Sequence, residues 1–264
     1  MAGTTLITTL HDSTGWSIES IKTFSDFFKD IYERLIVVAT EGTIPTVIEA
    51  LQNSGWIIIS LRSRVGVEHI SDSRRRVLRA GLESGSDFLH LVDMDRVLHW
   101  AQRFPGELRE VAGCIPHHGF LIIGRTRRAF LTHPRNQTET EVLANKVFSL
   151  IYGREVDITA ASRGISKEAA ENILRYSRGR FFDTDSEWPT ILLSKSKVEI
   201  TYIEAEGLEW ETYLKRRTMT FPDGRRVDLR EYYENNTESW VYRTMLAHRI
   251  ARAALDTFRE LKES

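Results

Sequence analysis

The sequence of 264 residues contains a single cysteine, Cys114. An internal disulfide and a metal site with several cysteines are therefore excluded, and a lone thiol suits a reducing compartment such as the cytoplasm. No apolar run approaches the roughly 20 residues that a helix needs to span a bilayer, and the N-terminus has no basic segment followed by an apolar stretch. We therefore expect a cytoplasmic protein with no transmembrane segment.

The sequence also lacks an excess of charge of either sign. Its 36 Lys and Arg residues nearly balance its 37 Asp and Glu residues, so the formal net charge is -1. Without a global positive field the chain has little attraction for nucleic acid or an anionic membrane, and we expect no nucleic-acid partner. The hydrophobic fraction of 41% is that of an ordinary globular protein, and the length permits one large α/β domain or two small ones, of which we expect one.

The first 125 residues alternate short apolar runs with amphipathic stretches, which is typical of βαβ units in a mostly parallel sheet. β-Branched and aromatic residues are frequent in the five segments that we expect to be strands. These segments are residues 5–10, 35–40, 56–61, 88–92 and 119–123. Helices should fill the intervals, including one over residues 71–84 and one from Pro105 to Val111.

The pattern changes after residue 125. Residues 130–136 are polar and contain a proline, so they predict a surface loop, and a long helix is expected over residues 138–152. Another helix should begin at Ser166, and the alternation over residues 198–205 predicts a strand. From about Glu238 onward, apolar residues recur at helical spacing, which predicts an amphipathic helix. Docking of this helix on the main domain is favoured over membrane-surface contact or dimerisation.

The most informative stretch is the apolar strand that runs into Asp93 and Asp95, two carboxylates spaced i, i+2. In a parallel α/β sheet, ligands bind beyond the carboxyl ends of the strands, where these side chains would emerge. Carboxylate oxygens suit Mg²⁺ or Mn²⁺, which usually also bind substrate phosphates, and such a cation neutralises the charge of a departing nucleoside diphosphate. An Asp-x-Asp triplet alone also occurs as a solvated loop or a helix cap.

The order of elements sharpens this interpretation. The predicted elements occur in a definite order. They are a strand, a helix, a strand ending in Ala-Thr-Glu41-Gly-Thr43, a third strand, an arginine-bearing helix and the Asp-x-Asp strand. Over residues 5–210 this order resembles the GT-A fold glycosyltransferases, and most of all the large inverting family that includes dolichyl-phosphate mannose synthase. The resemblance implies a metal-dependent transfer of a sugar from a UDP- or GDP-sugar to a small-molecule or phosphate-bearing acceptor, with Mg²⁺ or Mn²⁺ as cofactor.

Five residues match positions at which that family binds the nucleotide sugar. Thr9 and His11, at the end of the first strand, lie where the family binds the base, and Glu41 matches its acidic residue after the second strand. Arg76 matches an arginine near the diphosphate, and Asp93 completes the set. Arg74 to Arg76 and Arg79 would ordinarily form a solvated helix face, from which only one or two side chains need touch phosphate.

The resemblance also implies roles for residues in the second half. The segment from Val156 is similar to the family's Asp-x-Thr-x-Gly-x-Arg segment, in which Asp157 would be catalytic and Arg163 would bind the acceptor. Asp157 could equally brace the turn before the Ser166 helix. Glu187, in an acidic segment before a helix, is the second catalytic candidate.

A third metal ligand is less apparent than the two aspartates. His133 follows the core strands in the polar stretch where a lid over the diphosphate is expected, so it is a candidate metal ligand beside Asp93 and Asp95, or a phosphate contact.

Two other functions fit parts of the sequence. Residues 91–97 also match the strand-Asp-x-Asp-x-Val pattern of haloacid dehalogenase-type phosphatases, in which Asp93 would be the nucleophile. That motif normally opens its domain, whereas three strands precede it here. The alternative to both enzymes is an inactive nucleotide-binding or assembly module.

The resulting prediction is a single α/β domain of the GT-A type, with a mostly parallel central sheet flanked by helices. Residues 1–125 would form the nucleotide-sugar-binding half and residues 126–225 the acceptor-binding half of this domain. Residues 226–264 would form a C-terminal helical extension, and a homodimer through this extension is the alternative to its docking on the domain.

Overall fold

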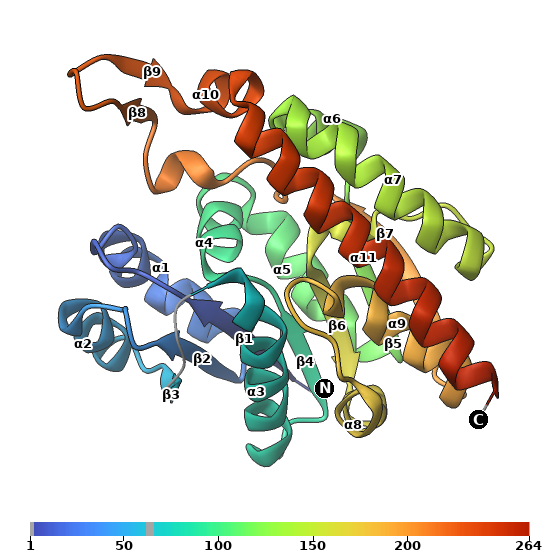
Figure 1. Cartoon of the computed structure of the whole chain (residues 1–264). Helices are drawn as coiled ribbons and strands as arrows, with labels where there is room; N and C mark the ends of the chain where they lie inside the picture. Colours follow the sequence, from blue (N-terminus) through green and yellow to red (C-terminus); the bar gives the residue numbers. More distant parts are fainter. Residues whose placement is uncertain (1–2, 62–65, 264) are drawn as a thin grey trace.

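Among residues 3–61 and 66–263, which the computed structural model describes, seven strands form one sheet in the order β3-β2-β1-β4-β6-β5-β7 (Figure 1). The strands are β1 (Thr4–Leu10), β2 (Arg34–Thr40), β3 (Ile57–Leu61), β4 (Phe88–Leu91), β5 (Phe120–Arg125), β6 (Ser162–Ser166) and β7 (Ile200–Ala205). Every pairing in this described sheet is parallel except those of β6, which is antiparallel to β4 and to β5. The mostly parallel α/β fold predicted from the sequence is confirmed.

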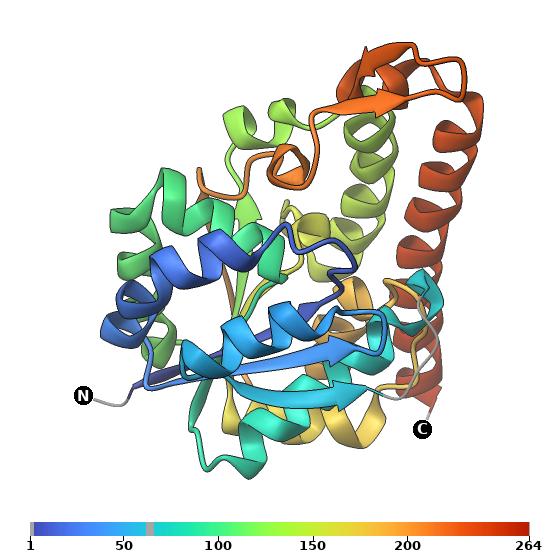
Figure 2. The same cartoon turned by 90° about the vertical axis from the view of Figure 1, so that its left-hand side faces the viewer.

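Helices cover both faces of the sheet (Figures 1 and 2). In the first half of the chain they are α1 (Ile18–Ile31), α2 (Pro45–Asn53), α3 (Ile70–Glu83), α4 (Met94–Arg103) and α5 (Pro105–Cys114). In the second half they are α6 (Arg127–Thr132), α7 (Arg135–Tyr152), α8 (Lys167–Tyr176), α9 (Thr184–Lys195), α10 (Leu229–Asn235) and α11 (Thr237–Glu263). Short 3₁₀ turns are η1 (Val67–His69), η2 (Ile115–His117), η3 (Ile158–Ala160) and η4 (Thr212–Leu214), and β8 (Thr218–Thr220) pairs with β9 (Arg226–Asp228) in a hairpin.

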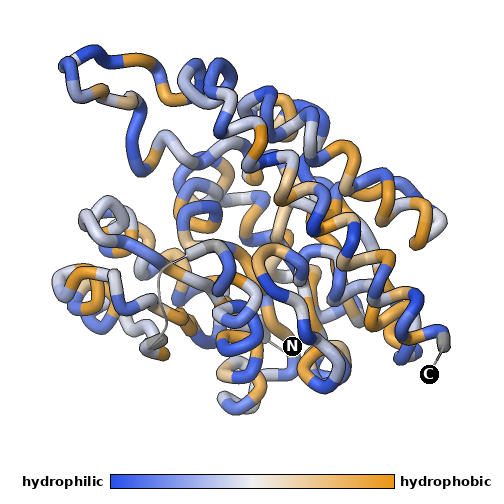
Figure 3. Tube along the Cα trace, viewed as in Figure 1, coloured by the Kyte–Doolittle hydropathy of each residue, from blue (hydrophilic) through white to orange (hydrophobic). Residues whose placement is uncertain are grey.

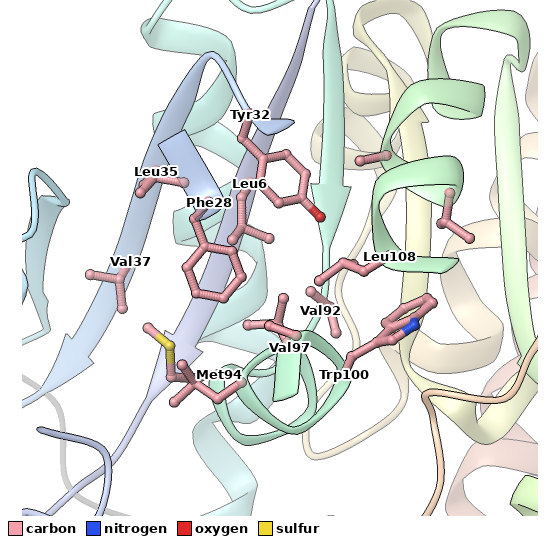
Figure 4. Packing of buried hydrophobic residues seen from close by; sticks show 14 of the residues in the cluster. Leu6, Phe28, Tyr32, Leu35, Val37, Val92, Met94, Val97, Trp100 and Leu108 are labelled. Atoms are coloured by element: carbon pink, nitrogen blue, oxygen red, sulfur yellow. The ribbon is translucent and has the colours of Figure 1, made fainter. Parts of the chain in front are cut away.

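Two apolar cores form because successive side chains of a strand point to opposite faces of the sheet. Leu6 of β1 packs in a core with α1, α2, α4 and α5, whereas its neighbour Ile7 packs in a core with α3, α7, α8, α9 and α11. Figure 4 shows the first core, in which Phe28, Trp100 and Leu108 converge on the sheet. The two cores hold the ends of β1 and β4 in fixed positions.

Helix α3 lies unusually close to the sheet. Gly81 makes this possible, because a Cβ at that position would lie 2.8 Å from a methyl group of Leu89 on β4. A glycine inside a helix costs about 1 kcal/mol relative to alanine, and here the close packing explains its presence. The approach brings Arg74 of α3 within hydrogen-bond distance of Asp93, which follows β4.

The C-terminal helix α11 docks on the domain, as predicted from its amphipathic pattern. It runs beside α7 and α9, and Ala247, Ile250 and Ala254 are buried in the interface. Along both α11 and α7 the trace alternates between hydrophobic and hydrophilic colours, as expected for helices with one packed face (Figure 3). The two helices therefore form a wall beside the end of the sheet.

The structure corrects the prediction of a loop over residues 130–136. Helix α6 ends at Thr132 and α7 begins at Arg135, so only His133 and Pro134 lie between them. Thr126 caps α6 by accepting a hydrogen bond from the amide of Ala129, and the polar residues that follow are largely buried. The polar composition was misleading because His133 and Asn136 are buried inside the fold and are not exposed to solvent.

Strand β6 and the β8–β9 hairpin are absent from the sequence-based prediction. β6 contains Arg163 and Gly164, which are poor strand formers, and its conformation depends on pairing with β4 and β5. The hairpin extends away from the sheet, as Figures 1 and 2 show, and η4 precedes it. Ser166 caps α8 through its side chain, which confirms the predicted start of that helix.

Candidate active site

A cavity of about 490 Å³ lies beyond the carboxyl ends of β1, β2 and β4. From the first half of the chain it is lined by Thr9, His11, Trp16, Arg74, Asp93 and Asp95, among others. From the second half it is lined by Gln137, Thr159, Asp185, Glu211, Lys215 and Arg243, among others. The cavity thus joins strand ends to helices α7, α9 and α11 and to the segment around η4.

Asp93 lies at the N-cap of α4, directly after β4, and its side chain is 24% exposed toward the cavity. One carboxylate oxygen, Oδ1, accepts a hydrogen bond from Oγ1 of Thr9 at 3.1 Å. The other, Oδ2, accepts one from Nη2 of Arg74 at 3.2 Å. Because β1 and β4 are neighbours in parallel register, the sheet itself brings Thr9 and Asp93 together.

Asp95 lies in the first turn of α4 and faces the same cavity. Its Oδ1 accepts a hydrogen bond from the amide of Arg96 at 2.9 Å, and its Oδ2 lies 2.5 Å from Nζ of Lys215. Burial by itself raises the pKa of this carboxyl, but Lys215 and Arg96 outweigh burial and hold the pKa below its usual value. Asp95 is therefore a carboxylate that is already paired with a cation.

Arg74 is the arginine of α3 that reaches the cavity. It is 1% exposed, and its Nη1 donates to Oδ1 of Asp185 at 2.6 Å and to Oγ1 of Thr184 at 3.2 Å. Burial by itself lowers the pKa of the guanidinium, but Asp185 and Asp93 outweigh burial and hold the pKa above its usual value. Arg74 is thus a permanent charge that links α3, α4 and α9.

Arg76, the diphosphate-binding residue expected from the resemblance, lies elsewhere. Its side chain is 48% exposed and pairs with Asp72 on the same helix, with Nε and Oδ2 3.1 Å apart. Residues two positions apart on a helix point in directions that differ by about 200°, so Arg74 and Arg76 cannot face the same cavity. Among the described residues, Arg76 does not line the cavity.

The other nucleotide-binding candidates are divided by the structure. Thr9 and His11 line the cavity, and Nδ1 of His11 lies 2.7 Å from Oγ1 of Thr40. Glu41 is exposed in the turn after β2 and lies outside the lining residues of the described chain. The end of β1 therefore contributes to the site more directly than the end of β2.

Asp157 is buried behind the cavity instead of facing it. Its carboxylate accepts hydrogen bonds from Nε of Arg125 at 2.7 Å and from Nδ2 of Asn145 at 2.9 Å. Burial raises the pKa of Asp157, but Arg125 and the other donors hold it well below its usual range. Arg125 also donates to Glu141 at 2.7 Å, so this network supports Glu141 and Thr159, which do line the cavity.

Arg163 and Glu187 are likewise buried and bound to the backbone. Arg163 donates to the carbonyl oxygens of Ser162, Ile158 and Asp185, and burial lowers the pKa of its guanidinium to about 10. Glu187 accepts hydrogen bonds from Oγ of Ser177 and from the amides of Arg178 and Gly179, each at 2.6 Å. Neither residue lines the cavity in the described part of the chain.

The acidic residue of this segment that faces the cavity is Asp185, two positions before Glu187. Burial is the largest effect on its carboxyl and raises the pKa, Asp93 raises it further, and Arg74 and Arg163 oppose the rise. A carboxyl group whose pKa is raised, in a cavity beside an arginine, has the properties of a general acid or base. The sequence indicates this acidic segment, but it does not indicate that Asp185, and not Glu187, faces the cavity.

His133 is 1% exposed and does not join the two aspartates. Its Nδ1 lies 3.2 Å from the carbonyl oxygen of Ala129, and its Nε2 has no partner among the described residues. Burial, together with Arg125 and Arg96, lowers the pKa of the ring well below its usual value. Within residues 3–61 and 66–263 no group of three His, Cys, Asp or Glu side chains is placed to hold a metal ion.

Lys215, Glu211 and Arg243 were not predicted from the sequence. Lys215 and Glu211 belong to the segment around η4, and Arg243 belongs to α11. The carboxylate of Glu211 is buried, and its Oε2 has no hydrogen-bond partner in the described chain. Nothing in the local sequence marks these residues, because long-range packing alone brings them to the cavity.

The arrangement of strands and helices is that of the GT-A fold. No protein-family model matches the chain, and no curated protein matches it in sequence. Solved structures of glucosyl-3-phosphoglycerate synthase from Mycobacterium tuberculosis match it over 98% of this chain and 80% of theirs. The structure with phosphoglyceric acid has a TM-score of 0.57 at 12% identity, and the structure with Mn²⁺, UDP-glucose and phosphoglyceric acid has a TM-score of 0.56 at 14% identity.

At these identities the comparison shows a shared fold. The predicted GT-A fold is confirmed, and the haloacid dehalogenase alternative is not favoured. The narrower likeness to the dolichyl-phosphate mannose synthase family stays a prediction. Among the helices in the described ranges, none combines the length and the apolar character needed to cross a membrane.

Proposed function

We propose that this chain is a metal-dependent glycosyltransferase that moves a sugar from a UDP- or GDP-sugar to a small acceptor. The observation that carries the proposal is the convergence of Asp93, Asp95 and Arg74 on a cavity beyond the end of β4. Two carboxylates suit Mg²⁺ or Mn²⁺, because such cations keep further positions for water and phosphate oxygens. Solved structures of similar fold contain Mn²⁺ with UDP-glucose or Mg²⁺ with UDP, which supports this choice of cofactor.

In this proposal Asp93 and Asp95 hold the cation, which neutralises the leaving diphosphate. Thr9 and Arg74 orient the carboxylate of Asp93 by binding one oxygen each. Because Arg74 is itself held by Asp185, its positive charge is fixed beside the diphosphate before the substrate arrives. Fixed charges of this kind stabilise a transition state without reorganisation.

We infer that the acceptor carries a phosphate or another anionic group. Arg243 of α11 lines the far side of the cavity, and the structures of similar fold contain phosphoglyceric acid. Asp185, rather than Asp157 or Glu187, is the proposed base for an acceptor hydroxyl, since it faces the cavity and its pKa is raised. Asp157, Arg163 and Glu187 are proposed to hold the surrounding backbone in place.

Calorimetry with UDP and with GDP, each with and without Mn²⁺, tests the proposal. We expect a nucleoside diphosphate to bind more tightly with the metal, and Asp93→Ala to abolish that difference. Asp26→Ala, which changes an exposed carboxylate on α1, is the matched control. The proposal fails if no diphosphate responds to the metal or if Asp93→Ala behaves like the control. Metal-dependent binding without turnover of any nucleotide sugar would favour the inactive module.

We also propose a cytoplasmic homodimer that forms through α11. Val241 and Met245 on this helix are 66% and 39% exposed, beside Leu143 of α7 at 65%. Light scattering on the wild type and on a Val241→Glu/Met245→Glu variant would measure the mass. A monomeric wild type would rule out the dimer and leave the proposed chemistry untouched.

A further inference from the structure

Lys215 forms a direct ion pair with one of the two proposed metal ligands. Its Nζ lies 2.5 Å from Oδ2 of Asp95 and 5.2 Å from the centre of the Trp16 ring. The side chain lines the cavity and is 38% exposed. It comes from the segment that follows η4, far from Asp95 in the sequence, so the contact exists only in the folded chain.

This contact competes with a cation for the same oxygen. Mg²⁺ lies about 2.0–2.1 Å from its oxygen ligands, so the ammonium group at its present distance and the metal would be two positive charges sharing the single oxygen Oδ2. The other oxygen of Asp95 already accepts the amide of Arg96. Binding of a divalent cation through Oδ2 is therefore favoured when Lys215 moves away from that oxygen.

The cavity offers the displaced ammonium group a new partner once the donor is present. A lysine side chain reaches out on a flexible four-carbon stem, so it can move without a change in the backbone. The diphosphate of a nucleotide sugar bound in this cavity would bring negative charge into the space that Lys215 lines. The ring of Trp16, 5.2 Å from Nζ of Lys215, lines the same cavity.

We propose that Lys215 is a donor-binding residue that exchanges Asp95 for the diphosphate when the metal and the nucleotide bind together. The inference rests on the proposed function and adds a consequence to it. Metal alone weakens the Lys215–Asp95 pair without compensation, whereas metal with diphosphate gives Lys215 a new anionic partner. Lys215 therefore couples the binding of the two ligands, so that each is bound more tightly in the presence of the other.

Substitution of Lys215 separates the two effects. Lys215→Met keeps the length of the side chain and removes its charge. Because the competing ammonium group is gone, we expect Mn²⁺ alone to bind about tenfold more tightly than to the wild type. At saturating Mn²⁺ we expect UDP to bind about tenfold more weakly, because a charge-assisted hydrogen bond to the diphosphate is lost. Calorimetry and the electron paramagnetic resonance signal of free Mn²⁺ measure both constants.

Two further variants test specificity. Arg216→Met removes the adjacent exposed cation from the same segment and should leave both constants unchanged, because Arg216 does not line the cavity among the residues described. Lys215→Arg should restore most of the UDP affinity, since a guanidinium also binds phosphate. Thermal unfolding of each variant checks that the fold is intact.

The inference is overturned if Lys215→Met binds Mn²⁺ alone no more tightly than the wild type, or if its affinity for UDP at saturating Mn²⁺ is unchanged. These results would leave the proposed function standing, provided that the wild type binds UDP in a metal-dependent manner. A wild type that binds neither Mn²⁺ nor UDP would instead reject the proposed function itself and the role of Lys215 with it. A parallel titration with GDP in place of UDP tests whether the outcome depends on the nucleotide base.

Discussion

The two walls of the cavity are built in different ways. The strand wall, with Thr9 and Asp93, consists of residues at the carboxyl ends of β1 and β4, so the sheet places them. The helix wall consists of side chains from α7, α9, α11 and the segment around η4, which only tertiary packing brings together. The local sequence therefore predicts the residues of the strand wall well and those of the helix wall poorly. Substitutions in each wall measure how far the two walls depend on each other.

The largest expected effect concerns the buried support of the helix wall. Asp157→Ala removes a carboxylate that binds Arg125, and leaves the guanidinium with Glu141 as its remaining acidic partner. Breaking a buried ion pair costs about 3–5 kcal/mol, and we expect a loss of stability near the lower end of this range. Urea unfolding followed by circular dichroism measures it. Asp256→Ala, which breaks an exposed pair with Arg252, should cost less than about 1 kcal/mol. Equal losses would show that the network does not support the wall.

The strand wall is tested by a change that alters charge but not shape. Asp93→Asn keeps the acceptor for Thr9 and removes the negative charge needed by a divalent cation. We expect metal-dependent UDP binding to weaken by about 100-fold, with little effect on folding. Calorimetry at a fixed Mn²⁺ concentration measures this loss. An unchanged affinity would mean that other residues hold the cation and that the strand wall does not bind the donor through a metal.

A matched pair on α3 tests which helix face serves the site. Arg74→Met removes the link between Asp93 and Asp185, and we expect UDP affinity to fall by about tenfold. Arg76→Met changes an exposed arginine on the same helix and should have no measurable effect on binding. Titration of both variants with UDP and Mn²⁺ decides between them. A larger loss for Arg76→Met would restore the assignment made from the sequence.

The smallest expected effect is a change in acid sensitivity. The pKa of Asp157 is depressed in the folded chain, so its contribution to stability is present above its unfolded value near 3.8 and is lost as the pH falls toward the folded value. Wild-type stability should therefore fall steeply below about pH 4, and Asp157→Asn should have a shallower slope there. Unfolding in urea from pH 5 to 3 measures the two slopes. Parallel slopes would indicate that the pKa of Asp157 does not differ between the folded and the unfolded state.

Much of the fold was predictable from the sequence, because the strands of the parallel sheet are short apolar runs. The segments expected at residues 5–10 and 88–92 agree with β1 and β4 to within one residue. β6 was not predictable, since Arg163 and Gly164 adopt a strand only between β4 and β5. The missed start of α7 has a related cause. Its polar residues Asn136 and Gln137 are buried, which composition alone does not reveal.

For the site, the sequence identified the correct segments more often than the correct residues. Asp93 and Asp95 follow directly from the end of a strand, whereas Arg76 and Glu187 each lie two positions from the side chain that lines the cavity. Helical phase causes this error, because two residues along a helix correspond to almost opposite faces. Lys215 had no local signal, since its partner Asp95 belongs to the other half of the chain.

The position of α11 sets the order in which the site can be completed during synthesis. Leu246, Ala247 and Ile250 close one side of the cavity, although the strands that carry Thr9 and Asp93 are made much earlier. A nascent chain that has released both halves of the sheet from the ribosome still lacks the side chains of α11 that line the cavity. Premature termination before residue 246 would therefore produce a chain with an intact Asp-x-Asp strand and without the part of the helix wall that shelters the chemistry from water.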